Sequence, residues 1–305
     1  MKNRALTGML MVLLAAMLWG TTGTAQTLVP AGLPAHWVGA LRLLVAAAFF
    51  WTYLLTRLRG QPFGVQLTSV RWGWVAVAAA SVATYNLTFF AGVQASSVAV
   101  GTAIALGSGP IWAGLLQLAV ARRSPPGVWW VGTSFAVAGG ALMVLGSAQQ
   151  LHMSMAGIGL CLVAGLSYAI YTLVSQRLVV QQTPAAVVTL CVFFCAALMA
   201  APLAFAVSGA PTVSLRGWLI MGYLGVVATG VAYLLFTHAL SRISATTAVS
   251  MCLVEPLTAF CLAILVIGER PPAAAFGGMA LVMLGLALVV RAELQGTRVA
   301  IATLD

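Results

Sequence analysis

The sequence predicts an all-α integral membrane protein with ten transmembrane helices. Of its 305 residues, 62% are hydrophobic and only 6% are charged, whereas soluble domains carry roughly 25% charged residues. A soluble fold of this length could not cover its core with so few polar side chains. Ten spans of about 20 residues each use most of the chain, so they leave short loops and no room for a soluble catalytic domain.

Ten long apolar runs, bounded by charged residues or by proline and glycine, give the predicted helices. Backbone polar groups find no water inside a bilayer, so each run must be helical. The first run follows Lys2 and Arg4, and without an Ala-x-Ala cleavage site it is predicted to stay as a span rather than to act as a signal peptide. In chain order the predicted helices cover residues 7–28, 36–56, 70–92, 97–119, 127–146, 154–177, 184–207, 215–238, 244–267 and 272–291.

The basic residues predict the orientation of these helices. Cytoplasmic loops of membrane proteins carry an excess of lysine and arginine. With the N-terminus inside, the opposite side holds only Arg216 and Arg270. We therefore expect both termini in the cytoplasm and the protein in the inner membrane. The residues then placed inside are Lys2, Arg4, Arg57, Arg59, Arg71, Arg122, Arg123, Arg177, Arg242, Arg291 and Arg298.

The two halves of the chain resemble each other, which indicates an internal repeat. Prolines and glycines align at an offset of 146 residues, and such residues match by chance less readily than apolar ones. Five helices per repeat would place the second repeat upside down, as in inverted-repeat transporters. We expect repeats over residues 1–148 and 149–292, followed by a cytoplasmic tail over 293–305. The aligned residues are Pro110 with Pro256, Pro125–Pro126 with Pro271–Pro272, Gly132 with Gly278 and Gly139 with Gly285.

Short motifs resemble the EamA family of the drug/metabolite transporter superfamily. They are Leu18-Trp19-Gly20 in the first span, Val254-Glu255-Pro256 in the ninth, and Ile267-Gly268-Glu269-Arg270 at its end. In the first repeat, Arg122-Arg123 stand where the family has Gly-Glu. The resemblance covers residues 7–291 and implies a 5+5 helix carrier. It also implies export of amino acids and related metabolites, with the aromatic and neutral amino-acid exporters as the most similar branch.

Glu255 is the one acidic residue deep within a predicted span. A carboxylate there is costly, so an intramembrane acid is a functional candidate. It could bind a substrate ammonium, carry a proton or pair with Arg42. Alternatively it is structural: Pro256 frees the carbonyl of Cys252, and a protonated Glu255 could donate to it.

Arg42 is the other charge that loops do not explain, since it lies six residues into the second span. Its side chain could reach the outer interface, or it could bind a carboxylate or act in gating. Gly109 and Pro110, within Gly107-Ser108-Gly109-Pro110 of the fourth span, and Pro256 are candidate hinges. The same small residues could instead allow close helix packing.

Aromatic and polar residues recur at matched places in the two repeats. Trp19 corresponds to Tyr168, and Tyr171 lies on the same helix face as Tyr168. Buried hydroxyl and amide groups need partners in hydrocarbon, and a polar substrate would supply them. Plain packing remains the alternative for each aromatic residue. The predicted substrate-binding set is Trp19, Tyr85, Asn86, Phe89, Trp112, Tyr168, Tyr171, Tyr233 and Glu255.

Other function classes are disfavoured by what the sequence lacks. Lys2 is the only lysine, so no Walker P-loop and no nucleotide site are predicted. The basic residues are scattered rather than clustered, which argues against nucleic acid. We expect no metal, cofactor or obligatory protein partner, only a small substrate and the bilayer. An intramembrane enzyme lacks the usual motifs, and an ion channel lacks charge rings or a filter loop.

Overall fold

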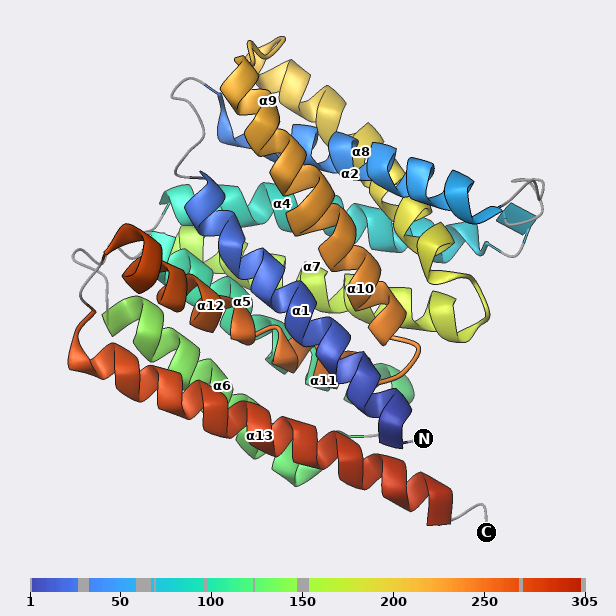
Figure 1. Ribbon diagram of the computed structural model, residues 1–305, viewed down its shortest axis with the longest axis vertical. Coiled ribbons are helices and arrows are strands. Elements are labelled where there is room, and N and C mark those ends of the chain that lie inside the picture. The colour runs from blue at the N-terminus through green and yellow to red at the C-terminus, as the bar shows by residue number, and fades with distance from the viewer. Residues whose placement is uncertain are drawn as a thin grey trace.

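The computed structural model describes residues 2–26, 33–58, 67–68, 70–95, 98–122, 124–146, 154–268 and 271–302, and these ranges contain helices and no strand. The bundle has layers, with α6 and α13 at one end and α2, α8 and α9 at the other (Figure 1). In chain order the helices are α1 (Lys2–Gln26), α2 (Ala35–Leu58), α4 (Trp72–Ala95), α5 (Val98–Ala121), α6 (Gly127–Gly146), α7 (Met155–Val180), α8 (Ala185–Ser208), α9 (Leu215–Gly222), η1 (Tyr223–Val231), α10 (Ala232–Ala239), α11 (Ala245–Met251), α12 (Val254–Leu262), η2 (Ala263–Ile267) and α13 (Ala273–Ala302).

The predicted helices agree closely with these bounds. α9, η1 and α10 form one unbroken span, in which η1 is wound as a π-helix. Two ends differ: α1 starts at Lys2 rather than near residue 7, and α13 continues to Ala302 rather than ending near 291. The prediction stopped at charged residues, but a helix continues beyond the apolar core wherever its residues favour helix. Glu269 and Arg270 of the family motif lie outside the described residues.

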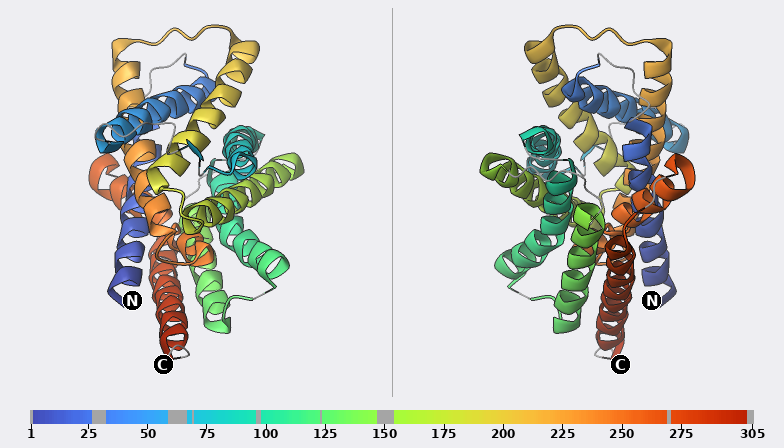
Figure 2. Two further views of the ribbon diagram at one scale, coloured as in Figure 1. Left: turned by 90° about the vertical axis from the view of Figure 1, so that its right-hand side faces the viewer. Right: turned by 90° about the vertical axis from the view of Figure 1, so that its left-hand side faces the viewer.

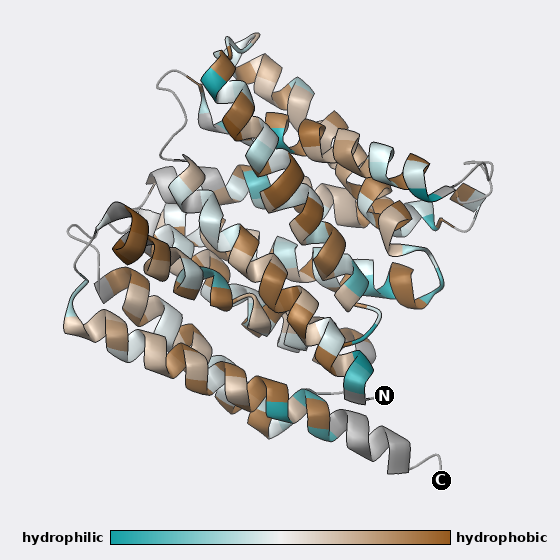
Figure 3. Cartoon of the chain, in the orientation of Figure 1, coloured by the Kyte–Doolittle hydropathy of each residue, from teal (hydrophilic) through white to brown (hydrophobic). Residues whose placement is uncertain are grey.

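Nine helices among the described residues are long and apolar enough to cross a membrane. α4, with 24 residues, also has the length of a span and consists mostly of apolar residues. Hydrophobic residues run along the helices in Figure 3, and large apolar side chains such as Leu219 and Leu265 are 69% and 82% exposed. Such surfaces suit lipid rather than water, so the chain is a multi-pass membrane protein.

The ninth span is broken where only a bend was expected. A turn at Cys252 and Leu253 separates α11 from α12. Pro256 has no N–H to give the Cys252 carbonyl, and the backbone N–H of Glu255 donates to that carbonyl instead, at 2.8 Å. The carbonyl freed by Pro256 therefore accepts a hydrogen bond from the backbone itself. The matched helix α5 stays helical through Pro110.

Helices of the two halves pack on each other throughout the bundle. α6 lies beside α13, α4 beside α7, and α2 beside α8, while α1 contacts α10 and α12 (Figure 2). At the α6–α13 contact, a Cβ added to Gly132 would lie 2.7 Å from the Gly285 carbonyl oxygen, and one added to Gly139 would lie 2.5 Å from that of Gly278. These four glycines therefore let the two backbones touch.

Candidate functional site

An aromatic cluster lies where α1, α4, α7 and α10 meet. Trp19 of α1 is 6.4 Å from Tyr168 and 4.8 Å from Tyr233, measured between ring centroids. Tyr85 of α4 is 6.0 Å from Tyr168. Tyr171 is 6.4 Å from Tyr168 and 5.8 Å from Tyr233. The structure thus brings together five residues that the sequence had placed in four separate spans.

Phe89 and Trp112 lie at the edges of this cluster. Phe89 stacks on Tyr85 at 5.6 Å. Trp112 packs on a small group of Ala113, Ala169 and Val249, against which Tyr168 also packs. Phe89 therefore adjoins the cluster at Tyr85, and Trp112 adjoins it through the small residues that Tyr168 also packs against.

Two further rings, Phe193 and Phe236, belong to the cluster and were not predicted. Phe193 lies 4.6 Å from Tyr233, and Phe236 lies 5.3 Å from Trp19. Phe236 is three residues from Tyr233 and so shares its helix face, a spacing from which it could have been found. Phe193 has no such signal, because its contact depends on how α8 packs against α10.

Arg42 points into the bundle from α2. Its Nη2 donates to Asn86 Oδ1 at 3.2 Å, and Asn86, itself buried, donates from Nδ2 to the Val82 carbonyl at 2.8 Å. Arg42 and Asn86 were separate candidates in the sequence. The bond holds the guanidinium against α4. The structure therefore does not favour the interpretation in which the Arg42 side chain reaches out to the membrane–water interface.

Glu255 lies in the first turn of α12 and interacts electrostatically with Arg42. Tyr85 and Tyr233 interact electrostatically with both charges. Within the described part of the chain, no ion pair or hydrogen bond joins Arg42 to Glu255. The two charges therefore act on the same aromatic residues without direct contact.

Gly20 explains how α1 reaches this site. A Cβ added there would lie 2.7 Å from the Glu255 carbonyl oxygen and 2.6 Å from the Thr258 Cβ. Any larger residue would push α1 away from α12. The Trp19-Gly20 and Glu255-Pro256 motifs thus meet in space.

Several donors in this region have no partner among the described residues. They are Arg42 Nε, Trp19 Nε1 and Trp112 Nε1, all buried. A buried donor without an acceptor costs roughly 1–3 kcal/mol, so native proteins rarely leave one unsatisfied. A bound ligand or water with acceptor atoms would satisfy these groups.

The candidate hinge residues take different positions. Gly109 faces Tyr168 and Val249, with room for a Cβ at 3.6 Å from each. Its neighbour Ser108 is packed against α7, since a Cβ at Gly165 would lie 2.9 Å from the Ala105 carbonyl oxygen and would also meet Ser108. Close packing therefore accounts for part of the small-residue stretch, while Gly109 adjoins the aromatic cluster. The described residues contain no group of three or more His, Cys, Asp or Glu that could hold a metal.

Comparisons with known proteins identify the family. A protein of Bacillus subtilis (strain 168) named "Uncharacterized transporter YwfM" is 37% identical over 283 residues, which is 92% of each chain. A Clostridium kluyveri protein named "Uncharacterized transporter" is 29% identical over 133 residues, 42% of each chain. A solved crystal structure matches the fold with a TM-score of 0.76 at 18% identity, covering 92% of this chain and 95% of that chain.

The model of the EamA-like transporter family matches residues 6–145 and 155–291. These two matches leave out only the start, the link between α6 and α7, and the end of α13. The protein therefore belongs to the EamA-like transporter family.

Proposed function

We propose that this protein is a secondary carrier that exports small zwitterionic metabolites, most suitably neutral or aromatic amino acids, across the inner membrane. The observation that carries the proposal is that Arg42 and Glu255 both act electrostatically on Tyr85 and Tyr233 of one aromatic cluster. An amino acid offers a carboxylate, an ammonium and an apolar side chain, and the site offers a partner for each.

Arg42 is the proposed partner of the substrate carboxylate. Arginine presents several donors in a planar fork that suits carboxylates. One Nη is held by Asn86, and the buried Nε lacks an acceptor among the described residues. A carboxylate arriving beside Arg42 would supply that acceptor.

Glu255 is the proposed partner of the substrate ammonium, or a proton carrier that exchanges its proton for substrate. The structural alternative would add a second hydrogen bond, from the Glu255 carboxyl, to the Cys252 carbonyl, which accepts from the backbone N–H of Glu255. Proton-coupled transport and uncoupled exchange are both compatible with one carboxylate at this place.

The aromatic cluster is the proposed pocket for the substrate side chain. Tyr85, Tyr168 and Tyr233 are partly exposed, although Tyr85 packs on Tyr168 and Tyr233 packs on Trp19. Ring faces and edges bind apolar and aromatic groups, while the tyrosine hydroxyls supply polar contacts. Such a lining, mostly apolar with a few placed polar groups, is typical of small-molecule sites.

Alternating access between two inverted repeats is the proposed mechanism. The family model matches the chain twice, and the glycine contacts support a two-fold relation. The sequence alignment pairs Gly132 with Gly278 and Gly139 with Gly285. A two-fold rotation that exchanges the repeats would therefore turn the Gly132–Gly285 contact into the Gly139–Gly278 contact, and both contacts are present. The same rotation would exchange α1 with α7 and α5 with α12, so it would turn the α1–α12 contact into the α5–α7 contact.

Hinges at Gly109, Pro110 and Pro256 would let the repeats rock about the site. The excess of basic residues on the side where α1 begins supports cytoplasmic termini. Carriers of other metabolites or drugs, a channel and an intramembrane enzyme are the competing functions.

Counterflow in proteoliposomes separates these functions. Vesicles loaded with unlabelled amino acid should transiently accumulate the labelled amino acid if the protein is a carrier. Simple leak would indicate a channel, and chemical conversion would indicate an enzyme. Competition by a panel of amino acids, sugars and cationic drugs would then identify the substrate class.

A further inference from the structure

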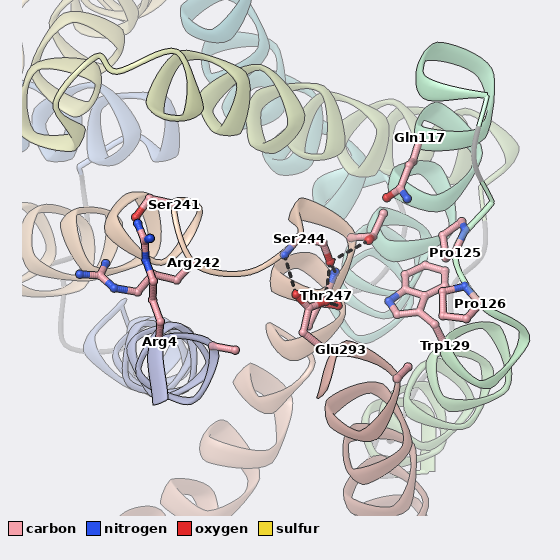
Figure 4. A pocket seen from close by; sticks show the side chains of 13 residues that line it. Arg4, Gln117, Pro125, Pro126, Trp129, Ser241, Arg242, Ser244, Thr247 and Glu293 are labelled. Atoms are coloured by element: carbon pink, nitrogen blue, oxygen red, sulfur yellow. Dashed lines mark hydrogen bonds between the residues drawn. The ribbon is translucent and has the colours of Figure 1, made fainter. Parts of the chain in front are cut away.

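A pocket of about 490 Å³ opens on the side where α1 begins (Figure 4). Its lining comes from the starts of α1, α6 and α11, the end of α5, the α5–α6 and α10–α11 links and the later part of α13. It includes Arg4, Gln117, Trp129, Arg242 and Glu293. This pocket is separate from the aromatic cluster, because none of the ring residues of that cluster lines it.

The short helix α11 separates the pocket from Glu255. Ser244 and Thr247 at its start line the pocket, and its end leads through the turn at Cys252 to Glu255. All seven residues of α11 are buried, and helices α1, α5, α6, α7 and α13 contact it. At 1.5 Å per residue the helix is about 10 Å long, which is thick enough to block a solute.

Polar contacts hold the start of α11 in place. The Glu293 carboxylate accepts from the Ser244 backbone N–H at 3.0 Å, from the Ser244 hydroxyl at 2.8 Å and from the Thr247 hydroxyl at 2.6 Å. From the opposite side, Gln176 donates to the Leu240 and Ile243 carbonyls at 3.2 and 2.8 Å and accepts from the Ala245 N–H at 3.2 Å. Hydrogen bonds to a charged group are the stronger kind, so Glu293 is the principal attachment.

A second attachment joins α11 to the first half of the chain. Thr133 Oγ1 of α6 lies 3.0 Å from Ser250 Oγ, and both residues are buried. The hydroxyls of Ser244, Thr247 and Ser250 recur every three residues, so they follow one face of α11 from the pocket toward Glu255. Polar groups on a buried face suit a path that opens to a polar solute.

We propose that α11 is the gate on this side of the protein and that the hydrogen bonds of Glu293 to Ser244 and Thr247, together with the Thr133–Ser250 bond, keep it closed. The pocket is then the entrance through which substrate reaches Glu255. This inference rests on the proposed carrier function. Opening requires α11 to leave α6 and Glu293, which exposes its hydroxyl face to the pocket. Glu293 and Gln176 are positioning residues in this scheme, since they act through α11.

A cross-link between residues 133 and 250 tests the gate. The double variant Thr133→Cys with Ser250→Cys replaces two hydroxyls that touch by two thiols. We expect oxidation to abolish counterflow and reduction to restore it, with both single variants active under either condition. If mass spectrometry shows a complete cross-link and exchange is still as fast as in the chemically reduced protein, the proposed gate is wrong. Absence of exchange in the reduced protein and in the native chain would instead refute the carrier function.

Thiol labelling gives an independent measure that requires no cross-link. In Ser250→Cys, mass spectrometry of the peptide holding residue 250 reports its reaction with N-ethylmaleimide. Adding Glu293→Gln should raise that rate severalfold, and Thr247→Val, a milder change, should raise it less. The exposed neighbour Gln295, changed to alanine, serves as the matched control and should have no effect. Equal labelling in all these proteins would contradict the proposal.

Discussion

The guanidinium of Arg42 donates to Asn86 Oδ1 at 3.2 Å, which joins α2 to α4 inside the membrane. The bond fixes the direction of a charge that would otherwise have several rotamers available. It also leaves Arg42 Nε directed toward no acceptor within the described chain. In the proposed carrier, Asn86 thereby positions Arg42 for the substrate carboxylate beside the aromatic cluster.

Replacing Asn86 with alanine should weaken substrate binding. A hydrogen bond to a charged group contributes roughly 1.5–3 kcal/mol, and 1.4 kcal/mol is about tenfold in affinity. We expect the KM for amino-acid counterflow to rise about tenfold or more. Thr88→Val is the control, because the Thr88 hydroxyl bonds only to the Thr84 carbonyl of its own helix among the described groups. Equal KM values for both variants would show that Asn86 does not position Arg42.

Glu255→Gln keeps the size of the side chain and removes its titration. If Glu255 carries a proton or binds the ammonium, the variant should transport more slowly, and its rate should no longer depend on pH. Initial counterflow rates from mildly acidic to mildly alkaline pH give the measurement. Unchanged uptake and an unchanged pH profile, at normal expression, would leave Glu255 with a structural role only.

Alanine at Trp19, Tyr85 or Tyr168 should change substrate preference. Each ring contacts at least one of the others, so each truncation enlarges the same space. The apparent affinity for bulky aromatic substrates should fall less than that for small substrates, because bulky substrates fill the new volume. Competition profiles identical to the native profile in all three variants would mean that the rings serve packing alone.

The neighbouring glycines Gly277 and Gly278 provide a matched test of helix packing. A Cβ at Gly278 would lie 2.6 Å from the Gly139 carbonyl oxygen, whereas one at Gly277 would meet nothing within 4 Å. Gly278→Ala should therefore lower the thermal midpoint in detergent by several degrees. Gly277→Ala should leave it unchanged or raise it, since alanine favours helix over glycine by about 1 kcal/mol. Similar midpoints for the two variants would contradict the close α6–α13 contact.

Hydrophobic runs predict the helices well, because a bilayer admits little else. The ninth span shows the limit of that reasoning. The sequence predicts a bend at Pro256, but the separation into α11 and α12 depends on a turn in which the Glu255 N–H bonds to the Cys252 carbonyl. A chain of apolar residues does not reveal such a local exchange of hydrogen bonds.

The sequence singles out candidate site residues where the chemistry of a side chain is unusual for its depth in the membrane. Arg42 and Glu255 are charges inside spans, and the tyrosines and Asn86 need partners there. The direction of Arg42 depended on which helix faces α2, which the sequence does not state. The sequence predicts that Glu293 lies in a tail, because Arg291 ends the last apolar run. Its bonds to Ser244 and Thr247 exist only because α13 continues alongside α11.

The most direct test of the central proposal compares three ligands that share one aromatic ring. Phenylalanine carries both charges, phenethylamine only the ammonium, and 3-phenylpropionate only the carboxylate. Labelled phenylalanine is followed by counterflow in proteoliposomes, with each compound as competitor. We expect phenylalanine to compete at least tenfold better than either analogue, since 1.4 kcal/mol per lost contact is about tenfold. Equal competition by all three, or no counterflow, would contradict recognition of a zwitterion between Arg42 and Glu255.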